Sequence, residues 1–200
     1  MSWVHLLPTR GTLAPSPPPN SEVPVLFLHG MLGSPGNFQP VAEELQRRNR
    51  WYIAPAYGNR ATASSAQCQA EIAAAVADID CVDIVAHSTG GVHGLWLAQH
   101  RPGLVRHLIG VGACFYGIPR LIRFPRLTAM ILGPAITELS QPLSATIPEQ
   151  TRVTSLISRA DTIVPPSSSL LGEVRYLSEN IRHEHLPQQV KPIIAALYDK

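Results

Sequence analysis

The sequence predicts an α/β fold, in which a mostly parallel sheet carries helices on both faces. Short, continuous apolar runs typical of buried parallel strands alternate with longer segments of helical periodicity along most of the chain. This alternation indicates βαβ units, because parallel strands need a crossover connection between them. Of the 200 residues, 45% are hydrophobic and 15% are charged, which favours one compact domain over a disordered chain.

The first part of the chain supplies two strands and two helices. Residues 23–30, VPVLFLHG, are a continuous apolar run that ends in glycine, as a strand buried on both faces does. A helical pattern follows over 37–50, and 51–57 form the second predicted strand. Residues 64–80 are rich in alanine, the strongest helix former, and one of the two serines at their start is the expected N-cap.

The same alternation continues toward the end of the chain. Its strands are short apolar runs, and its helices space their apolar residues three or four apart. These elements are strands at 81–87, 104–113, 152–158 and 174–178 and helices at 89–100 and 186–199.

Two segments depart from the alternation. Residues 1–22 include a run rich in proline and serine and are expected to form an extended lead-in, so that 23–200 make up a single domain. Residues 115–150 are rich in proline and apolar residues but poor in clear strands. Because they follow the C-terminal end of a strand, we expect them either to cover a ligand site at that edge or to be ordinary connecting helices.

Composition argues against several classes of protein. The formal net charge of +2 is too small to indicate nucleic acid or an anionic membrane as a partner. Cys68, Cys81 and Cys114 are too few and too widely spaced for a disulfide framework or a metal site. No apolar run reaches the roughly 20 residues of a membrane span, and the N-terminus does not resemble a signal peptide. A cytoplasmic location is the default expectation, and secretion stays open.

A serine occupies the break between the strand at 81–87 and the helix at 89–100. Ser88 lies in the stretch DIVAHSTGG, whose small residues allow a sharp turn that holds the side chain above the sheet edge. The N–H of Thr89 opens the helix and points where negative charge is favoured. The sequence therefore indicates a nucleophilic hydroxyl beside an anion site. The alternative is a serine that only caps the helix.

The pattern Ala-His-Ser-x-Gly-Gly around Ser88 resembles the nucleophile elbow of the α/β-hydrolases, in particular that of small bacterial lipases of the Bacillus type. Ala86 stands where the first glycine of the elbow is usual. In that family the acid and the histidine follow the serine in chain order. The resemblance extends over roughly residues 23–198 and implies the compact α/β-hydrolase fold.

Two later stretches resemble the other catalytic positions of the family. Asp161 follows a strand in the pattern Ser-x-Ala-Asp, which is similar to the acid position of the lipases, whereas Glu173 and Glu179 do not follow a strand so directly. His183 opens a His-x-x-Leu pattern that resembles the His-x-x-Leu-Leu segment of the lipases. His185, two residues later, is the alternative base.

The glycine-rich loop that begins at His29-Gly30 resembles the oxyanion loop of the family, in which the residue after the glycine donates its backbone N–H. Carried over to this chain, the two donors are Met31 and Thr89. A phosphate-binding loop is disfavoured because the chain has neither G-x-x-x-x-G-K-[ST] nor G-x-G-x-x-G.

The resemblance implies a hydrolase of carboxylic esters that works through a Ser-His-Asp triad and an acyl-enzyme, without metal or cofactor. The apolar residues of 115–136 favour a hydrophobic small-molecule ester, with lipase and esterase undistinguished. Two alternatives stay open: other acyl chemistry on the same fold, such as a thioesterase or acyltransferase, and a non-catalytic binding protein. The sequence does not indicate an oligomeric state.

Overall fold

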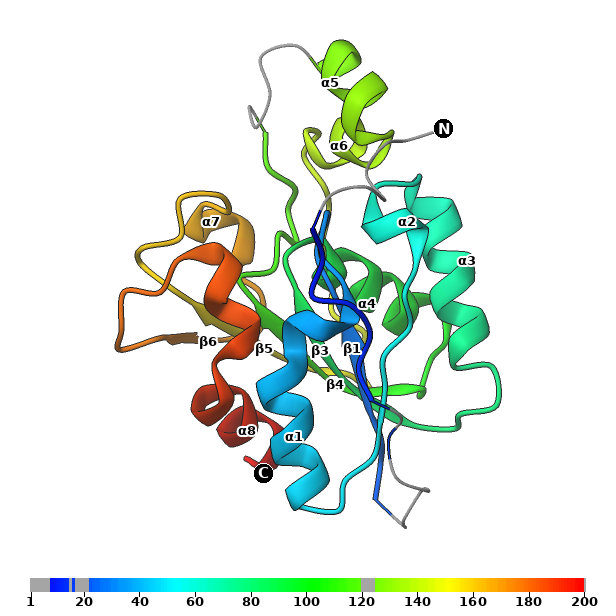
Figure 1. The fold of residues 1–200 in the computed structure, drawn as a ribbon, viewed down its shortest axis with the longest axis vertical. Helices are drawn as coiled ribbons and strands as arrows, with labels where there is room; N and C mark the ends of the chain where they lie inside the picture. Colours follow the sequence, from blue (N-terminus) through cyan, green and yellow to red (C-terminus); the bar gives the residue numbers. More distant parts are fainter. Residues whose placement is uncertain (1–7, 15, 17–21, 120–124, 200) are drawn as a thin grey trace.

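The computed structural model describes residues 8–14, 16, 22–119 and 125–199 (Figure 1). Within this part of the chain, six strands form one sheet in the order β2-β1-β3-β4-β5-β6, and every neighbouring pair is parallel. The strands are β1 Val25–Leu28, β2 Tyr52–Ile53, β3 Val82–His87, β4 Val105–Val111, β5 Arg152–Ile157 and β6 Glu173–Tyr176.

Helices connect the strands and cover the sheet. The α-helices are α1 Gln39–Arg47, α2 Gly58–Ala61, α3 Ser65–Ala75, α4 Thr89–His100, α5 Pro125–Leu132, α6 Ala135–Leu139, α7 Pro166–Ser169 and α8 Val190–Tyr198. Two 3-10 helices, η2 Pro35–Phe38 and η3 His183–Gln188, precede α1 and α8. None of the described helices is both long and apolar enough to cross a membrane.

The core lies on both faces of the sheet because successive side chains of a strand point to opposite sides. In β1, Val25 and Phe27 pack in the apolar cluster that includes residues of α1 and α8. Leu26 and Leu28 pack on the other face, in the cluster that includes residues of α3 and α4. Figure 1 shows α1 and α8 on one side of the strands and α3 and α4 on the other. The predicted α/β fold with a parallel sheet and helices on both faces is thus confirmed.

Individual elements differ from the sequence prediction in their bounds. The second strand is only Tyr52–Ile53, and the chain then enters the short helix α2. Asn59, Arg60 and Ala61 there have positive φ angles of 45°, 64° and 56°, which no propensity pattern in the sequence signals. The closing helix begins at Val190 because the four residues before it belong to a 3-10 turn that contains Pro187 and to its cap.

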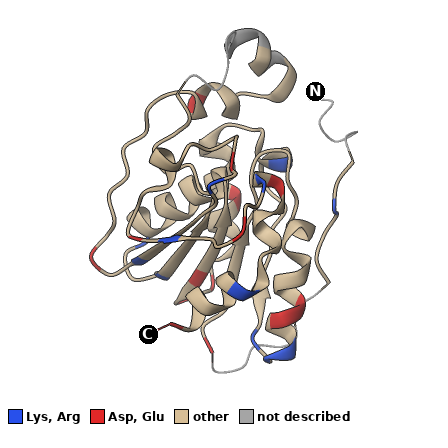
Figure 2. Ribbon diagram, turned by 90° about the vertical axis from the view of Figure 1, so that its left-hand side faces the viewer, with Lys and Arg blue, Asp and Glu red and all other residues tan. Residues whose placement is uncertain are grey.

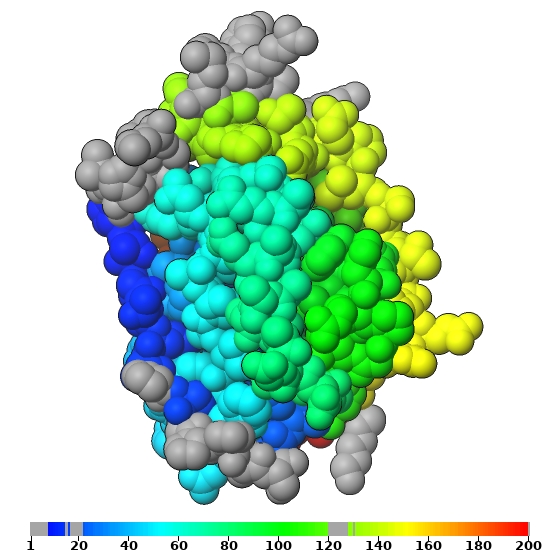
Figure 3. All heavy atoms as spheres, turned by 90° about the vertical axis from the view of Figure 1, so that its right-hand side faces the viewer, coloured from blue at the N-terminus to red at the C-terminus, as the bar shows by residue number. Residues whose placement is uncertain are grey.

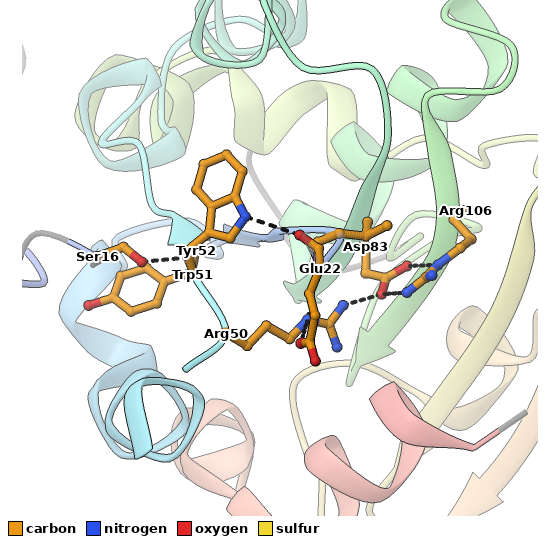
Figure 4. A network of polar contacts seen from close by, with 8 residues as sticks. Ser16, Glu22, Arg50, Trp51, Tyr52, Asp83 and Arg106 are labelled. Carbon is orange, nitrogen blue, oxygen red and sulfur yellow. Dashed lines mark hydrogen bonds and ion pairs between the residues drawn. The ribbon is translucent and has the colours of Figure 1, made fainter. Parts of the chain in front are cut away.

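At the N-terminal edge of the sheet, the carboxylate of Asp83 is 0% exposed and forms ion pairs with two arginines (Figure 4). Asp83 Oδ1 accepts a hydrogen bond from Arg106 Nε at 2.9 Å, and Asp83 Oδ2 also contacts Arg50 Nη2. The Arg50 side chain is itself only 3% exposed, and its Nε lies 4.0 Å from Glu22. Charge is scattered and sparse elsewhere, as Figure 2 shows.

Part of the predicted lead-in 1–22 lies outside the described residues. Its described residues 8–14 and 16 contain no helix or strand and contact the domain. Gly11 accepts a backbone hydrogen bond from Gly36, and Ser16 Oγ accepts one from Tyr52 N at 2.8 Å.

The segment 115–150 forms α5 and α6, which lie beyond the C-terminal edge of the sheet (Figure 1); residues 120–124 lie outside the described part. Glu138 Oε2 accepts a hydrogen bond from Ser65 N at 2.8 Å, and Ala135 N donates to Thr62 O at 3.3 Å. Figure 3 shows this yellow-green segment resting on the cyan and teal surface of α2 and α3. The segment is therefore anchored beside the edge at which β3 ends.

Candidate active site

Ser88 lies in a strained turn between β3 and α4. Its φ of 54° and ψ of −122° are outside the regions that a residue with a side chain normally adopts. Such a conformation costs on the order of 1–3 kcal/mol and persists only where the surroundings enforce it. Gly90 permits the close approach that this requires, because a Cβ there would lie 2.2 Å from the carbonyl oxygen of Leu28.

The ends of the neighbouring strands enclose the turn. Ser88 N donates to Val111 O at 3.3 Å, and Cys114 N donates to Ser88 O at 3.2 Å. On the side of β1, a Cβ on Gly30 would lie 2.8 Å from Ser88 Cβ. The loop after β1 and the loop after β4 therefore both contact the serine.

The carboxylate of Asp161 is fixed at both oxygens. Oδ1 accepts the N–H groups of Ile163 and Val164, each at 2.9 Å, and Oδ2 lies 2.7 Å from His183 Nδ1. Burial alone would raise the pKa of Asp161, but the hydrogen bonds from His183 and the two amides outweigh it and lower that pKa. An ionised carboxylate beside Nδ1 selects the tautomer with the hydrogen on Nδ1, which leaves the lone pair on Nε2.

Gly112, which directly follows β4, makes room for this pair. Its φ is +54°, and a Cβ there would lie 3.1 Å from Asp161 Oδ2, 3.4 Å from His183 Nδ1 and 2.6 Å from Leu186 Cδ1. Sequence analysis missed this residue, although a glycine immediately after a strand end is a signal for close approach.

Ser158 joins the loop of the acid to the loop of the histidine. Its buried Oγ accepts the N–H of Ala160 at 3.2 Å and that of Ile181 at 3.0 Å, and its carbonyl accepts Asp161 N at 3.3 Å. The sequence analysis included this serine in a motif but assigned it no role.

The two candidate histidines differ in their surroundings. His183 is 9% exposed, and its ring lies 4.5 Å from the ring of His87, whose Nε2 is 3.0 Å from the His183 carbonyl oxygen. The His185 side chain is 43% exposed, and its Nε2 lies 3.9 Å from Glu184. The structure thus brings His183, and not His185, to Asp161.

The candidate oxyanion donors lie on either side of the serine. Within the described part of the chain, Met31 N–H donates no backbone hydrogen bond, and Thr89 N–H is the first of α4, where no helical carbonyl is available. Leu32, next to Met31, is held by Arg60: Leu32 N donates to Arg60 O at 2.8 Å, and the guanidinium donates back to Leu32 O. This anchor for the loop was not foreseen from the sequence.

A cavity of about 270 Å³ opens beside the turn, between α3, α4 and α6. It is bounded by Ala61, Ser65, Gln69, Thr89, Val92, His93, Ala135, Glu138, Leu139 and Leu143. A small apolar cluster of Cys114, Ile118, Leu139 and Val164 adjoins it, with Met31 and Val92 packed against the cluster. Among the described residues no group of three or more His, Cys, Asp or Glu side chains is placed to hold a metal ion.

Comparison with known proteins identifies the family of the chain. The sequence profile of the alpha/beta hydrolase family matches residues 25–192. The chain therefore belongs to the alpha/beta hydrolase family, as the sequence motifs indicated; its likeness to lipases of the Bacillus type stays a prediction. No curated protein sequence matches the chain significantly.

Solved structures of similar fold include several hydrolases. An esterase from Rhodococcus superposes with a TM-score of 0.67 at 14% identity, covering 91% of each chain. A metagenome-derived lipolytic enzyme superposes with a TM-score of 0.64 at 21% identity, and the match covers 87% of this chain and 90% of that enzyme. An extracellular alpha/beta-hydrolase from a Paenibacillus species superposes with a TM-score of 0.63 at 14% identity, and the match covers 89% of this chain and 100% of that hydrolase. At these identities the similarity lies in the fold.

Proposed function

We propose that this protein is a serine carboxylic-ester hydrolase in which Ser88 is the nucleophile, His183 the general base and Asp161 the residue that orients it. The observation that carries the proposal is the 2.7 Å contact between His183 Nδ1 and Asp161 Oδ2. The ring of His183 lies 4.5 Å from that of His87, the residue that precedes Ser88 in its strained turn. A hydroxyl needs a base to become nucleophilic, and a base needs an orienting acid.

In the proposed reaction, Ser88 Oγ attacks the acyl carbon while its proton passes to His183 Nε2. The electron pair of the C=O bond moves to the oxygen, and the backbone N–H groups of Met31 and Thr89 stabilise the resulting negative charge. His183 then donates the proton to the leaving alcohol, which departs as the acyl-enzyme forms. Water, deprotonated by His183, attacks the acyl-enzyme and releases the carboxylic acid and Ser88.

The surroundings of the serine support an uncharged ester with at least one small arm. The cavity of about 270 Å³ beside Thr89 is at the lower limit for small-molecule sites. Long acyl chains would exceed it, and the apolar cluster around Cys114 and Leu139 favours hydrocarbon over charge. We therefore expect short-chain esters to be better substrates than long-chain lipids.

The proposal is tested by the hydrolysis of p-nitrophenyl esters of increasing acyl length. We expect activity with a short-chain optimum, and we expect Ser88→Ala and His183→Ala each to lower kcat by at least about a thousandfold. His185→Ala is the matched control and should keep most of the activity.

Loss of activity in His185→Ala with retention in His183→Ala would refute the assignment of the base. If the folded wild type hydrolysed no ester, labelling by a fluorophosphonate would separate the two alternatives. Labelling at Ser88 would favour a thioesterase or acyltransferase, and its absence a binding protein.

A further inference from the structure

Two polar side-chain atoms at the cavity beside Ser88 have no hydrogen-bond partner. Thr89 Oγ1 and His93 Nδ1 are buried and unpaired, and the two residues are only 5% and 4% exposed. They lie four positions apart on α4, so they share one face of the helix, and both residues bound the cavity. Buried polar groups in proteins are nearly always paired, so unpaired groups at a cavity indicate a ligand or water that pairs with them.

His93 is held as a neutral hydrogen-bonding group. Burial, and to a lesser extent the proximity of His29, lowers the pKa of His93 to about 4. Its ring meets the ring of Tyr57 edge to face at 5.8 Å, which fixes its orientation. Nδ1 of the neutral ring is a donor in one tautomer and an acceptor in the other, so a ligand group that both donates and accepts hydrogen bonds pairs with it in either tautomer.

Glu138 brings a carboxylate to the opposite wall of the cavity. Its Oε2 accepts the backbone N–H of Ser65 at 2.8 Å and the Ser65 hydroxyl. A negative charge facing a neutral His93 disfavours an anionic ligand. A hydroxyl suits these walls, because it can accept a hydrogen bond from His93 and donate one to Glu138 or Thr89.

We propose that this cavity selects esters in which one arm carries a neutral hydroxyl group a few atoms from the scissile carbonyl, with His93 as the residue that recognises it. The proposal rests on the proposed esterase function. It assigns His93 a role in specificity and none in the chemistry at Ser88.

The test compares pairs of esters that differ only by a hydroxyl in place of a methyl group. For the acyl arm the pair is methyl 3-hydroxybutanoate and methyl 3-methylbutanoate, and for the alcohol arm it is 2-hydroxyethyl butanoate and propyl butanoate. Release of acid is followed by titration at constant pH. We expect the wild type to prefer the hydroxylated member of one pair by about tenfold in kcat/KM, the effect of one neutral hydrogen bond.

Three variants then test whether His93 causes the preference for the hydroxylated ester. His93→Leu should abolish it, and His93→Asn, whose amide lies near the position of Nδ1, should restore part of it. Val92→Ala is the matched control, since Val92 bounds the same cavity without a polar atom and its loss should leave the preference unchanged. The rate with the methyl member of each pair reports whether a variant still folds and catalyses.

Equal kcat/KM values within both pairs for the wild type, or a preference that survives in His93→Leu, would overturn the proposal and leave water as the partner of these atoms. If His93→Leu does not fold, the comparison of the two esters in the wild type and in His93→Asn still tests whether His93 recognises the hydroxyl group. Failure of the proposed esterase function looks different, because then neither member of either pair would be hydrolysed.

Discussion

His87, next to the proposed nucleophile, connects two parts of the site that are far apart in the sequence. Its Nε2 lies 3.0 Å from the carbonyl oxygen of His183, a residue 96 positions away. Burial is the main cause that lowers the pKa of His87 to about 3, so the ring is neutral and can donate its Nε2–H. This hydrogen bond orients the backbone of the proposed base.

We expect His87→Phe to lower kcat about tenfold with little change in KM, because it keeps a ring but removes the donor. His87→Gln, whose amide nitrogen is near the position of Nε2, should recover much of the loss. Steady-state kinetics with one short-chain ester measures both. Equal kcat values for His87→Phe and the wild type would show that the hydrogen bond is dispensable.

Site residues that stand in short motifs could be predicted from the sequence, whereas the hydrogen bonds that hold their loops in place could not. Ser88, Asp161 and His183 stand in local patterns, and the structure brings the latter two together. The hydrogen bond from Ile181 N to Ser158 Oγ and that from Leu32 N to Arg60 O join loops distant in sequence, so no local pattern reports them.

Among the elements, β3 shows how a strand can be predicted while its energetics cannot. The apolar run of residues 81–87 predicted the strand, but it contains Asp83, whose partners Arg50 and Arg106 come from other elements. The helix bounds show a similar limit. The expected N-cap is Ser64, whose Oγ accepts Gln67 N at 3.3 Å, but the 3-10 turn that delays the last helix to Val190 was not predicted, although it contains Pro187.

We expect Asp83→Ala to destabilise the fold by about 3–5 kcal/mol, because it leaves the buried guanidinium of Arg50 with only the half-exposed carboxylate of Glu22, 4.0 Å away, as a charge partner. Urea denaturation of wild type and variant measures the loss. Glu44→Ala is the control: its partners Arg47 and Arg48 lie on the exposed side of α1, so a much smaller effect is expected. Equal midpoints for Asp83→Ala and the wild type would show that Arg50 finds another partner or reaches water.

For the molecule as a whole, buried histidines should control the stability toward acid. With 14 acidic and 16 basic residues, the chain has little net charge, and Figure 2 shows its charges of both signs dispersed. His29, His87, His93 and His107 are all buried, and burial is the first cause that lowers their pKa values to about 4, 3, 4 and 4. Since histidine in an unfolded chain has a pKa of about 6.5, the unfolded state binds more protons than the folded state below that pH.

The stabilising contribution of these histidines is therefore complete above about pH 6.5 and is lost as the pH falls toward their folded pKa values near 4 and 3. Four such groups give a slope of at most about 5 kcal/mol per pH unit between these limits. The lowered pKa of Asp161 adds a further loss at still lower pH.

Urea denaturation at intervals from pH 7.5 to pH 4.5 measures the slope. His93→Asn should make it shallower, whereas His185→Asn, which changes an exposed ring, should leave it unchanged. A free energy of unfolding that stayed constant over this range would mean that these four rings take up protons in the folded state, and thus that water reaches them.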